Sequence, residues 1–170
     1  MKQPRTIKHF ILLSISLLSI NVFAQKTETI KHKHALGAGA GFTTGYGLSY
    51  RYIPNKFGVQ VNFAPYKSES ITRFSTGLTF LYQLMETDKT ALYLYQANHY
   101  YSNSNSAAYN QVTGLYDKKE EEAYFNNGLG FGFEVIIVKN IGFNLMTGYA
   151  LYQNAKNYNV TGEAALYFKF

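Results

Sequence analysis

The sequence contains no cysteine and no tryptophan, and it has only three prolines. Without cysteine the chain has no disulfide framework, no thiolate metal site and no cysteine nucleophile. Charged residues make up 15% of the 170 residues, against about 25% in a typical soluble domain. This deficit indicates that much of the surface does not face water. Tyrosine and phenylalanine are abundant instead, with 16 and 13 residues, which argues against disorder.

The formal net charge of +6 is weak evidence for a nucleic-acid partner. Three of the 16 basic residues, Lys2, Arg5 and Lys8, lie in the first 24 positions, where there is no acidic residue. Without that segment, 13 basic residues remain against 10 acidic ones, a net charge of +3. The remaining basic residues form no stripe, so we expect no nucleic-acid binding.

The first 24 residues have the form of an export signal. A basic segment at Met1–His9 precedes an apolar run at Phe10–Ile20, which is about half the length of a membrane-spanning helix. Small or modest side chains three residues and one residue before Gln25 favour cleavage after Ala24. The sequence therefore predicts a signal peptide over 1–24 and a short periplasmic segment over 25–34. An ordinary buried helix is the alternative, and a lipoprotein anchor is excluded because no cysteine follows the cleavage site.

Beyond residue 34 apolar and polar residues alternate with period two, which is the signature of β-strands. In the clearest example, Ala123–Ile137, large apolar side chains oppose asparagine, glycine and glutamate. The pattern predicts eight strands, at 35–42, 47–52, 57–65, 72–84, 91–101, 123–137, 141–153 and 158–170. In the fifth strand Leu92 and Leu94 alternate with Tyr93 and Tyr95, so both faces are apolar and its facing stays open.

The connections between these strands alternate in length. Three are short and polar: Pro54–Lys56, Glu86–Thr90 and Lys139–Asn140. The other four, at 43–45, 66–70, 102–122 and 154–157, fall between them. An even number of strands with short periplasmic turns is the rule for transmembrane barrels. We therefore predict an all-β fold, an eight-stranded antiparallel up-and-down barrel over 35–170, with the long loop 102–122 outside the cell.

The polarity of the two strand faces separates a membrane barrel from a soluble ligand-binding barrel of the lipocalin kind. A soluble barrel has an apolar lumen and a charged outer face, whereas a membrane barrel has an apolar outer band and a polar lumen. Here the face opposite the aromatic residues is rich in Gly, Ser, Thr, Asn and Gln and carries few charges. That face suits a narrow lumen better than a water-exposed surface. The aromatic face is then predicted to meet lipid, with tyrosine forming the interfacial belts.

The end of the chain adds a separate observation. Leu166, Phe168 and Phe170 alternate on one face, and the last residue is aromatic. Together with the export signal and the eight short strands, this resembles the small outer-membrane barrels of the OmpA/OmpX type of diderm bacteria. The resemblance implies insertion into outer-membrane lipid and recognition of the terminal strand by the barrel assembly machinery. Because the chain ends at the barrel, we expect no periplasmic peptidoglycan-binding domain of the kind that some members carry.

Five charged residues fall on the predicted lumen face: Arg51, Arg73, Glu134, Glu163 and Lys169. Charges in a low-dielectric space must pair or contact water, so we interpret these residues as a structural polar network that plugs the barrel. Matching depth along the strands makes Arg51 or Lys169 the expected partner of Glu134. An ion path or gate is the alternative interpretation. Acid–base catalysis by the two carboxylates is less favoured, because the nearby cations would stabilise their charged forms.

The histidines give no strong prediction of a site. His32 and His34 could share one face of a strand, but flanking lysines favour a solvated periplasmic tail, so no metal site is predicted. His99 lies near the external end of its strand, close to Ser102 and Ser104. Some outer-membrane barrels that modify lipid A use such residues, but no matching motif is present, and we predict no catalytic residue. The alternating glycines lack a following helix or lysine, so no nucleotide or other cofactor is predicted.

The long external loop is the expected contact surface for a macromolecular partner. It carries Tyr109 and Tyr116 beside a charge run that begins at Asp117 and Lys118, and exposed tyrosine is a good contact residue. The sequence thus predicts a monomeric, non-enzymatic outer-membrane protein with a structural or surface-interaction role through its external loops. The alternatives are a narrow pore or transporter for small or hydrophobic solutes and a lipid A-modifying enzyme.

Overall fold

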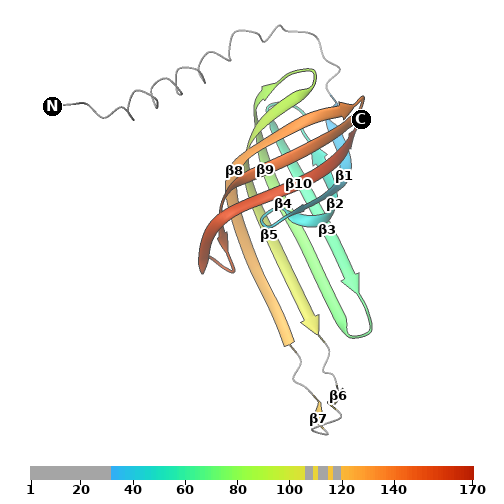
Figure 1. Ribbon diagram of the computed structural model, residues 1–170, viewed down its shortest axis with the longest axis vertical. Coiled ribbons are helices and arrows are strands. Elements are labelled where there is room, and N and C mark those ends of the chain that lie inside the picture. Colours follow the sequence, from blue (N-terminus) through green and yellow to red (C-terminus); the bar gives the residue numbers. More distant parts are fainter. Residues whose placement is uncertain (1–31, 106–108, 111–114, 117–119) are drawn as a thin grey trace, which may run out of the picture.

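The structure, a computed structural model, describes residues 32–105, 109–110, 115–116 and 120–170. Its eight long strands close into an antiparallel barrel, and a short two-stranded sheet, β6–β7, stands apart from it (Figure 1). The predicted signal peptide over 1–24 lies outside the described residues. The strands are β1 (His34–Gly41), β2 (Gly45–Tyr52), β3 (Phe57–Lys67), β4 (Ile71–Glu86), β5 (Thr90–Asn105), β6 (Tyr109–Asn110), β7 (Leu115–Tyr116), β8 (Glu120–Val138), β9 (Ile141–Tyr152) and β10 (Asn157–Lys169).

The predicted eight-stranded antiparallel barrel is confirmed. Neighbouring barrel strands are consecutive in the chain except that β5 pairs with β8, and β10 pairs with β1 to close the barrel. The seam between β1 and β10 runs in register from Ala35 opposite Lys169 to Gly41 opposite Glu163. The start of β1, the end of β10 and the short turns all lie at one end of the barrel. The rule for transmembrane barrels assigns this end to the periplasm, and we call the other end external. In the described part of the chain no helix is long and apolar enough to cross a membrane.

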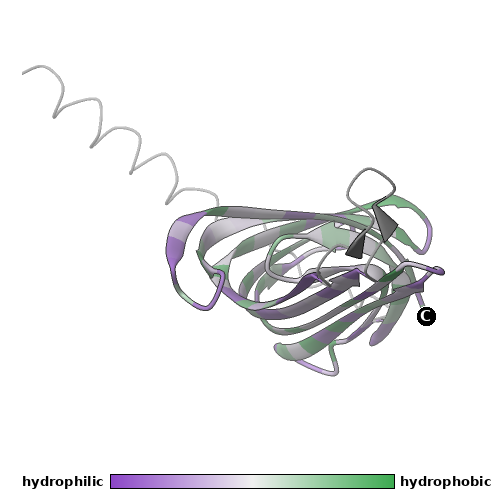
Figure 2. Ribbon diagram, turned by 90° about the horizontal axis from the view of Figure 1, so that it is seen from below, coloured by the Kyte–Doolittle hydropathy of each residue, from purple (hydrophilic) through white to green (hydrophobic). Residues whose placement is uncertain are grey.

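The two faces of the barrel wall differ as a membrane barrel requires. On β8, the outward side chains of Leu129, Phe131 and Phe133 are 57%, 55% and 46% exposed, whereas inward Glu134 is 1% exposed. Apolar and polar residues alternate along the strands in Figure 2. The most buried side chains include many polar ones, among them Arg51, Gln60, Asn62, Thr79, Glu134 and Asn144. An apolar outer surface around a polar interior is the polarity of a barrel that spans lipid, and the reverse of a soluble barrel.

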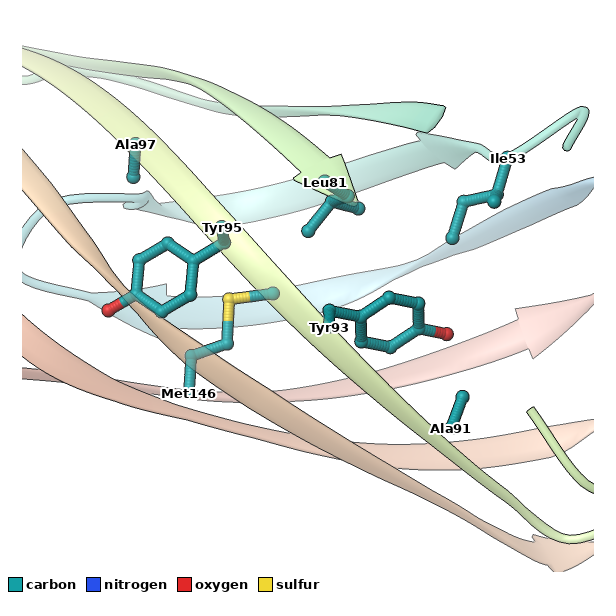
Figure 3. Close-up of a cluster of buried hydrophobic side chains, with 7 residues drawn as sticks. All are labelled: Ile53, Leu81, Ala91, Tyr93, Tyr95, Ala97 and Met146. Carbon is teal, nitrogen blue, oxygen red and sulfur yellow. The ribbon is translucent and has the colours of Figure 1, made fainter. Parts of the chain in front are cut away.

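The facing of β5, which the sequence left open, is settled by the structure. Tyr93 and Tyr95 are each 2% exposed and point into the lumen with Ala91 and Ala97. Figure 3 shows both tyrosine rings projecting from β5 among the buried apolar side chains. These rings help to fill an eight-stranded barrel, whose interior has room only for packed side chains.

The barrel wall is uneven at its external end. Strands β4, β5 and β8 have 16, 16 and 19 residues, although about 9–11 residues suffice to cross a membrane. Their outer parts include 102–105 and 120–122, which the sequence assigned to the long loop and which the structure pairs as Ser102 opposite Ala123 through Asn105 opposite Glu120. Strands β1 and β2 have only 8 residues each. The wall is therefore low at the β1–β2 hairpin and high at β4, β5 and β8.

The turn between β1 and β2 folds into the lumen rather than outward. The sequence treated it as an external loop, yet Thr43 and Thr44 are each 1% exposed. Gly77 makes room for this turn, because a Cβ atom there would lie 1.7 Å from the backbone oxygen of Thr44. Gly45 follows with a φ of +80°, a conformation that glycine adopts without strain. The inward turn thus closes the lumen below its external mouth.

The backbone oxygen of Phe42 anchors this turn to the far wall. It accepts hydrogen bonds from Asn126 Nδ2 at 3.0 Å and from His99 Nδ1 at 3.1 Å. Thr43 Oγ1 lies 3.2 Å from Thr161 Oγ1 on β10. Side chains of β5, β8 and β10 therefore hold the turn that connects β1 to β2.

Candidate functional site

Glu134 lies between two cations at the periplasmic end of the lumen. Arg51 Nη1 donates to Glu134 Oε2 at 2.6 Å, and Lys169 Nζ forms an ion pair with Glu134 Oε1. The side chains of Arg51 and Glu134 are 2% and 1% exposed. A carboxylate held by two cations from β2 and β10 ties three strands together across the lumen.

Aromatic rings and an amide complete the surroundings of Arg51. Its Cζ atom lies 4.2 Å from the ring centroid of Tyr167 and 5.5 Å from that of Tyr93, within the range of cation–π attraction. Its Nε and Nη2 atoms donate to Gln60 Oε1 at 3.1 and 2.6 Å. The guanidinium is thus fixed by partners on β3, β5, β8 and β10.

The network continues toward the middle of the barrel through amides. Gln60 Nε2 donates to Glu163 Oε1 at 3.2 Å and to Asn62 Oδ1 at 3.1 Å. Asn62 Oδ1 also accepts from Ser49 Oγ at 2.6 Å, and Asn62 Nδ2 donates to the backbone oxygen of Gly45 at 3.1 Å. Side chains therefore fill the lumen from Lys169 up to the inward turn.

Arg73 lies apart from this network. The sequence placed it on the lumen face, but its side chain is exposed, and Arg73 Nε donates to Asn103 Oδ1 at 3.1 Å. The reason is that β4 continues well past the inward turn, so its outer inward-facing positions lie in solvent. The structure thus brings Arg51, Glu134 and Lys169 into contact, and links Glu163 to them through Gln60.

His34 belongs to β1 rather than to a solvated tail. Its backbone exchanges two hydrogen bonds with Phe170, at 3.2 and 2.9 Å, and the two rings stack with centroids 5.8 Å apart. Leu166, Phe168 and Phe170 point outward and are 52%, 54% and 53% exposed. Among the residues that the structure describes, no group of three His, Cys, Asp or Glu side chains could hold a metal ion.

At the external end the lumen opens into a cavity of about 940 Å³. Its lining comprises six tyrosine or phenylalanine rings, one histidine, four amide side chains, Gly41 and Val160. Phe42 and Tyr46 come from the low β1–β2 hairpin, and the other rings come from β5, β8, β9 and β10. As far as the structure describes the chain, this lining contains no aspartate, glutamate, lysine or arginine.

One side of the cavity is a row of rings, which we call the aromatic wall: Tyr46, His99, Tyr101 and Tyr124. Tyr46 meets His99 edge-on at 6.5 Å between centroids, His99 lies 6.4 Å from Tyr101, and Tyr101 lies 5.0 Å from Tyr124. The four rings come from β2, β5 and β8. The planes of successive rings are inclined by 70°, 59° and 31°, so the wall is a connected cluster of ring faces and edges, with hydroxyls on its three tyrosines.

Another part of the lining is formed by side-chain amides of the β9–β10 turn and the start of β10, which we call the amide wall: Gln153, Asn157 and Asn159. Asn157 Nδ2 donates to Gln153 Oε1 at 2.9 Å, and Asn159 Oδ1 accepts from the backbone N–H of Val160 at 2.8 Å. Within the described residues this leaves Gln153 Nε2, Asn157 Oδ1 and Asn159 Nδ2 without a hydrogen-bond partner. Two donors and one acceptor are therefore available at the cavity.

A serine–histidine pair lies under the floor of the cavity. His99 Nε2 is 2.9 Å from Ser75 Oγ. Because His99 Nδ1 faces the Phe42 oxygen, which can only accept, Nδ1 carries the proton and Ser75 donates to Nε2. Ser75 is 0% exposed. The sequence drew attention to Ser102 and Ser104 instead, since the register that brings β4 against β5 cannot be read from the sequence.

The predicted partner loop is described only in part. Tyr109 and Tyr116 pair across the β6–β7 sheet, and Asp117 and Lys118 lie outside the described residues. Of the aromatic wall, the sequence drew attention to His99 but did not indicate that the tyrosines form a site with it. Their shared signal was a tyrosine near the external end of each of three strands.

No protein-family model and no curated protein sequence matches the chain. Among solved structures, the N-terminal β-barrel domain of Pseudomonas aeruginosa OprF aligns with a TM-score of 0.54 at 13% identity, covering 81% of this chain and 95% of that one. Neisserial surface protein A aligns with a TM-score of 0.48 at 14% identity, covering 81% and 94%. Yersinia pestis Ail in a nanodisc gives 0.43 at 13% identity, covering 82% and 100%. The chain thus shares the outer-membrane β-barrel fold of the OprF domain, and its own eight strands close the barrel.

Proposed function

We propose that the protein is a non-enzymatic component of a bacterial outer membrane that acts as a closed barrel and recognises a partner at its external end. The observation that carries the proposal is the contrast along the lumen. Its periplasmic part is filled by the Arg51–Glu134–Lys169 network, whereas its external part opens into the 940 Å³ cavity. A closed membrane protein with an open outer mouth is suited to surface contact rather than to transport.

The narrow-pore alternative has less support. A pore needs a continuous wet path, but Arg51, Gln60, Asn62 and Glu134 are at most 1% exposed. Above them the β1–β2 turn, with Thr43 1% exposed, crosses the lumen. Passage of a solute would require breaking the buried ion pairs and moving the turn, and breaking a buried pair costs several kcal/mol.

The lipid-modifying enzyme alternative rests on Ser75 and His99. Their 2.9 Å contact has the geometry of a nucleophile and its base. However, Ser75 is fully buried, and the backbone N–H of Tyr46 approaches its Oγ at 3.5 Å. We interpret the pair as a structural support under the cavity floor, because a nucleophile must be reachable by its substrate.

The absence of cysteine from the chain allows a direct test of orientation and closure. Asn157→Cys at the external turn should react in intact cells with a maleimide that cannot cross membranes, and Lys139→Cys at the periplasmic turn should not. Labelling of Lys139→Cys alone would reverse the proposed orientation. In planar bilayers the unmodified protein should leave the conductance at baseline, and regular single-channel steps would overturn the closed barrel.

A further inference from the structure

We infer that the external cavity binds an uncharged saccharide. This inference rests on the proposed surface function and names the class of its ligand. The starting point is the lack of charge: in the described chain the cavity lining holds rings and amides but no formally charged side chain. An ionic ligand entering such a site would lose water without gaining a counter-charge, which is costly.

The aromatic wall supplies the apolar half of the recognition. Tyr101 and Tyr124 lie 5.0 Å apart between centroids and 31° apart in plane, so they pack partly against each other, and both rings line the cavity. A sugar ring has an apolar face of C–H groups, which packs against such rings and buries area without needing a charge. Tyrosine is suited to this role because its ring is apolar while its hydroxyl can still bond at the edge.

The amide wall supplies the polar half. Gln153 Nε2 and Asn159 Nδ2 are available donors, and Asn157 Oδ1 is an available acceptor. A saccharide hydroxyl both donates and accepts, so a row of amide groups of both kinds matches a ring that carries several hydroxyls. The combination of aromatic rings and uncharged amides in one lining therefore fits an amphipathic ring.

The amide wall is held in place before any ligand arrives. Gln153, Asn154 and Ala155 have φ values of 52°, 60° and 65°, so the β9–β10 turn has three successive left-handed residues. Phe125 and Asn154 exchange hydrogen bonds at 3.0 and 2.9 Å, and the Gln153 N–H donates to Asn126 Oδ1 at 2.9 Å. A turn pinned in this way orders its side chains in advance, which lowers the entropic cost of binding.

The hydrogen bonds at the edge of β10 make an added peptide strand a poorer occupant of the cavity than a saccharide. Above the seam, β10 extends past the end of β1, so part of its edge faces the cavity. The edge groups of Val160 are already used, since its N–H donates to Asn159 Oδ1 and its oxygen accepts from Tyr152 Oη at 3.0 Å. The Gly162 oxygen accepts from the Phe42 N–H at 3.3 Å. A peptide would therefore find few free backbone groups, whereas a saccharide uses the side chains.

The test is a binding titration with the full chain refolded in a phosphocholine detergent, since sugar-headed detergents would compete. The probes are uncharged hexose and N-acetylhexosamine oligosaccharides, together with sialylated or sulfated forms of the same cores. We expect saturable binding of an uncharged probe and weaker binding of its charged forms. No saturable binding of any uncharged probe, or tighter binding of the charged forms, would overturn the inference.

Matched variants locate the site. Tyr101→Ala should weaken binding roughly tenfold, and Tyr101→Phe should stay close to the unmodified protein, because the ring face remains. Tyr100→Ala is the control: Tyr100 is the neighbouring tyrosine of β5, but it points to the outer face and is 42% exposed. Asn157→Ala should also weaken binding, since it removes an acceptor. Equal losses in Tyr100→Ala and Tyr101→Ala would place the binding elsewhere and contradict the inference.

Two further comparisons complete the test. One assigns the source of the saccharide, and the other distinguishes failure of the saccharide inference from failure of the proposed surface function. Free oligosaccharides can be compared with uncharged fragments of the producing strain's own surface polysaccharide; tighter binding of either assigns the source. If Asn157→Cys is labelled from outside and the barrel is closed while no saccharide binds, the saccharide inference fails and the proposed surface function remains. If Lys139→Cys alone is labelled, the surface function fails as well.

Discussion

The periplasmic and external parts of the lumen share several strands but differ in chemistry. Around Arg51 and Glu134 the side chains are charged, paired and buried. Around Tyr101 and Asn157 they are uncharged and face a cavity. The strand alternation dictates only that these residues point inward. An inward residue fills the lumen where all the strands continue around it. It remains available to a ligand where the short β1–β2 hairpin leaves the lumen open.

Tyrosine shows this difference within one residue type. Tyr93 and Tyr167 flank the Arg51 guanidinium in the filled part, where both side chains are buried. Tyr101 and Tyr124 lie above the inward β1–β2 turn, where the low hairpin leaves the lumen open. Tyrosines below the turn therefore serve packing, and tyrosines above it are free to contact another molecule.

The largest effect is expected from breaking the filled part at its centre. Glu134→Ala leaves two cations without their carboxylate and should lower the free energy of unfolding by about 3–5 kcal/mol. The urea midpoint of the refolded protein measures the loss. Glu69→Ala, at an exposed position, is the control. In a double-mutant cycle, Glu134→Ala with Arg51→Ala should be less damaging than the sum of the single changes, and strict additivity would indicate that Glu134 is solvated.

The second effect tests the outer surface against the lumen. Phe131→Lys puts a cation on the lipid-facing surface of β8 and should cost about 2–4 kcal/mol, whereas Phe125→Lys, nearer the external end of the same face, should cost about 0–1 kcal/mol. Urea unfolding in lipid vesicles compares the two variants. A harmless Phe131→Lys would mean that this face does not meet lipid.

A smaller effect is expected at the boundary between the two parts. Asn126 donates to the Phe42 oxygen and accepts from the Gln153 N–H, so it joins the inward turn to the external β9–β10 turn. Asn126→Ala should lower the free energy of unfolding by about 1–3 kcal/mol. Asn159→Ala, at an exposed position, should stay within about 0.5 kcal/mol. Equal urea midpoints for the two variants would show that the turns are held independently.

The smallest effect is expected at Asn144, which is 0% exposed. Among the described residues neither polar atom of its side chain has a hydrogen-bond partner. Asn144→Leu keeps the side-chain volume and removes two buried polar atoms that have no partner, so it should raise the free energy of unfolding by no more than about 1 kcal/mol. Asn62→Leu, which removes three hydrogen bonds, should be clearly destabilising. Similar unfolding midpoints would mean that the amide network adds little to the filled part.

The sequence predicted the architecture because the decisive signal is local. The alternation in Ala123–Ile137 identified the strand and its lipid face, and the structure agrees with both. The facing of β5 could not be predicted, because Tyr93 and Leu94 are both large and apolar. The outer parts of β5 and β8 were missed because polar residues pair there without any apolar face.

The external site was hidden from the sequence for a different reason. Its composition depends on which strands extend and on how far the β1–β2 turn dips into the lumen. Thr43 and Thr44 look like ordinary polar turn residues. They can enter the lumen because Gly77, far along the chain, has no Cβ atom to block the Thr44 backbone. Likewise, His99 meets Ser75 through the register of two long strands. Such relations depend on three-dimensional pairing rather than on local pattern.

The seam between β1 and β10 couples the external site to the integrity of the whole barrel. Phe42 and Tyr46 come from the start of the barrel, and Asn157 and Asn159 come from its last strand. The cavity is therefore assembled only when the two ends of the sheet have joined. A ligand that fills it binds the closed barrel alone, and by mass action it would add about 2.7 kcal/mol of stability at a concentration one hundred times its Kd. A bound ligand would hold the two strands of the seam together, so the free energy of unfolding of the barrel would measure ligand binding.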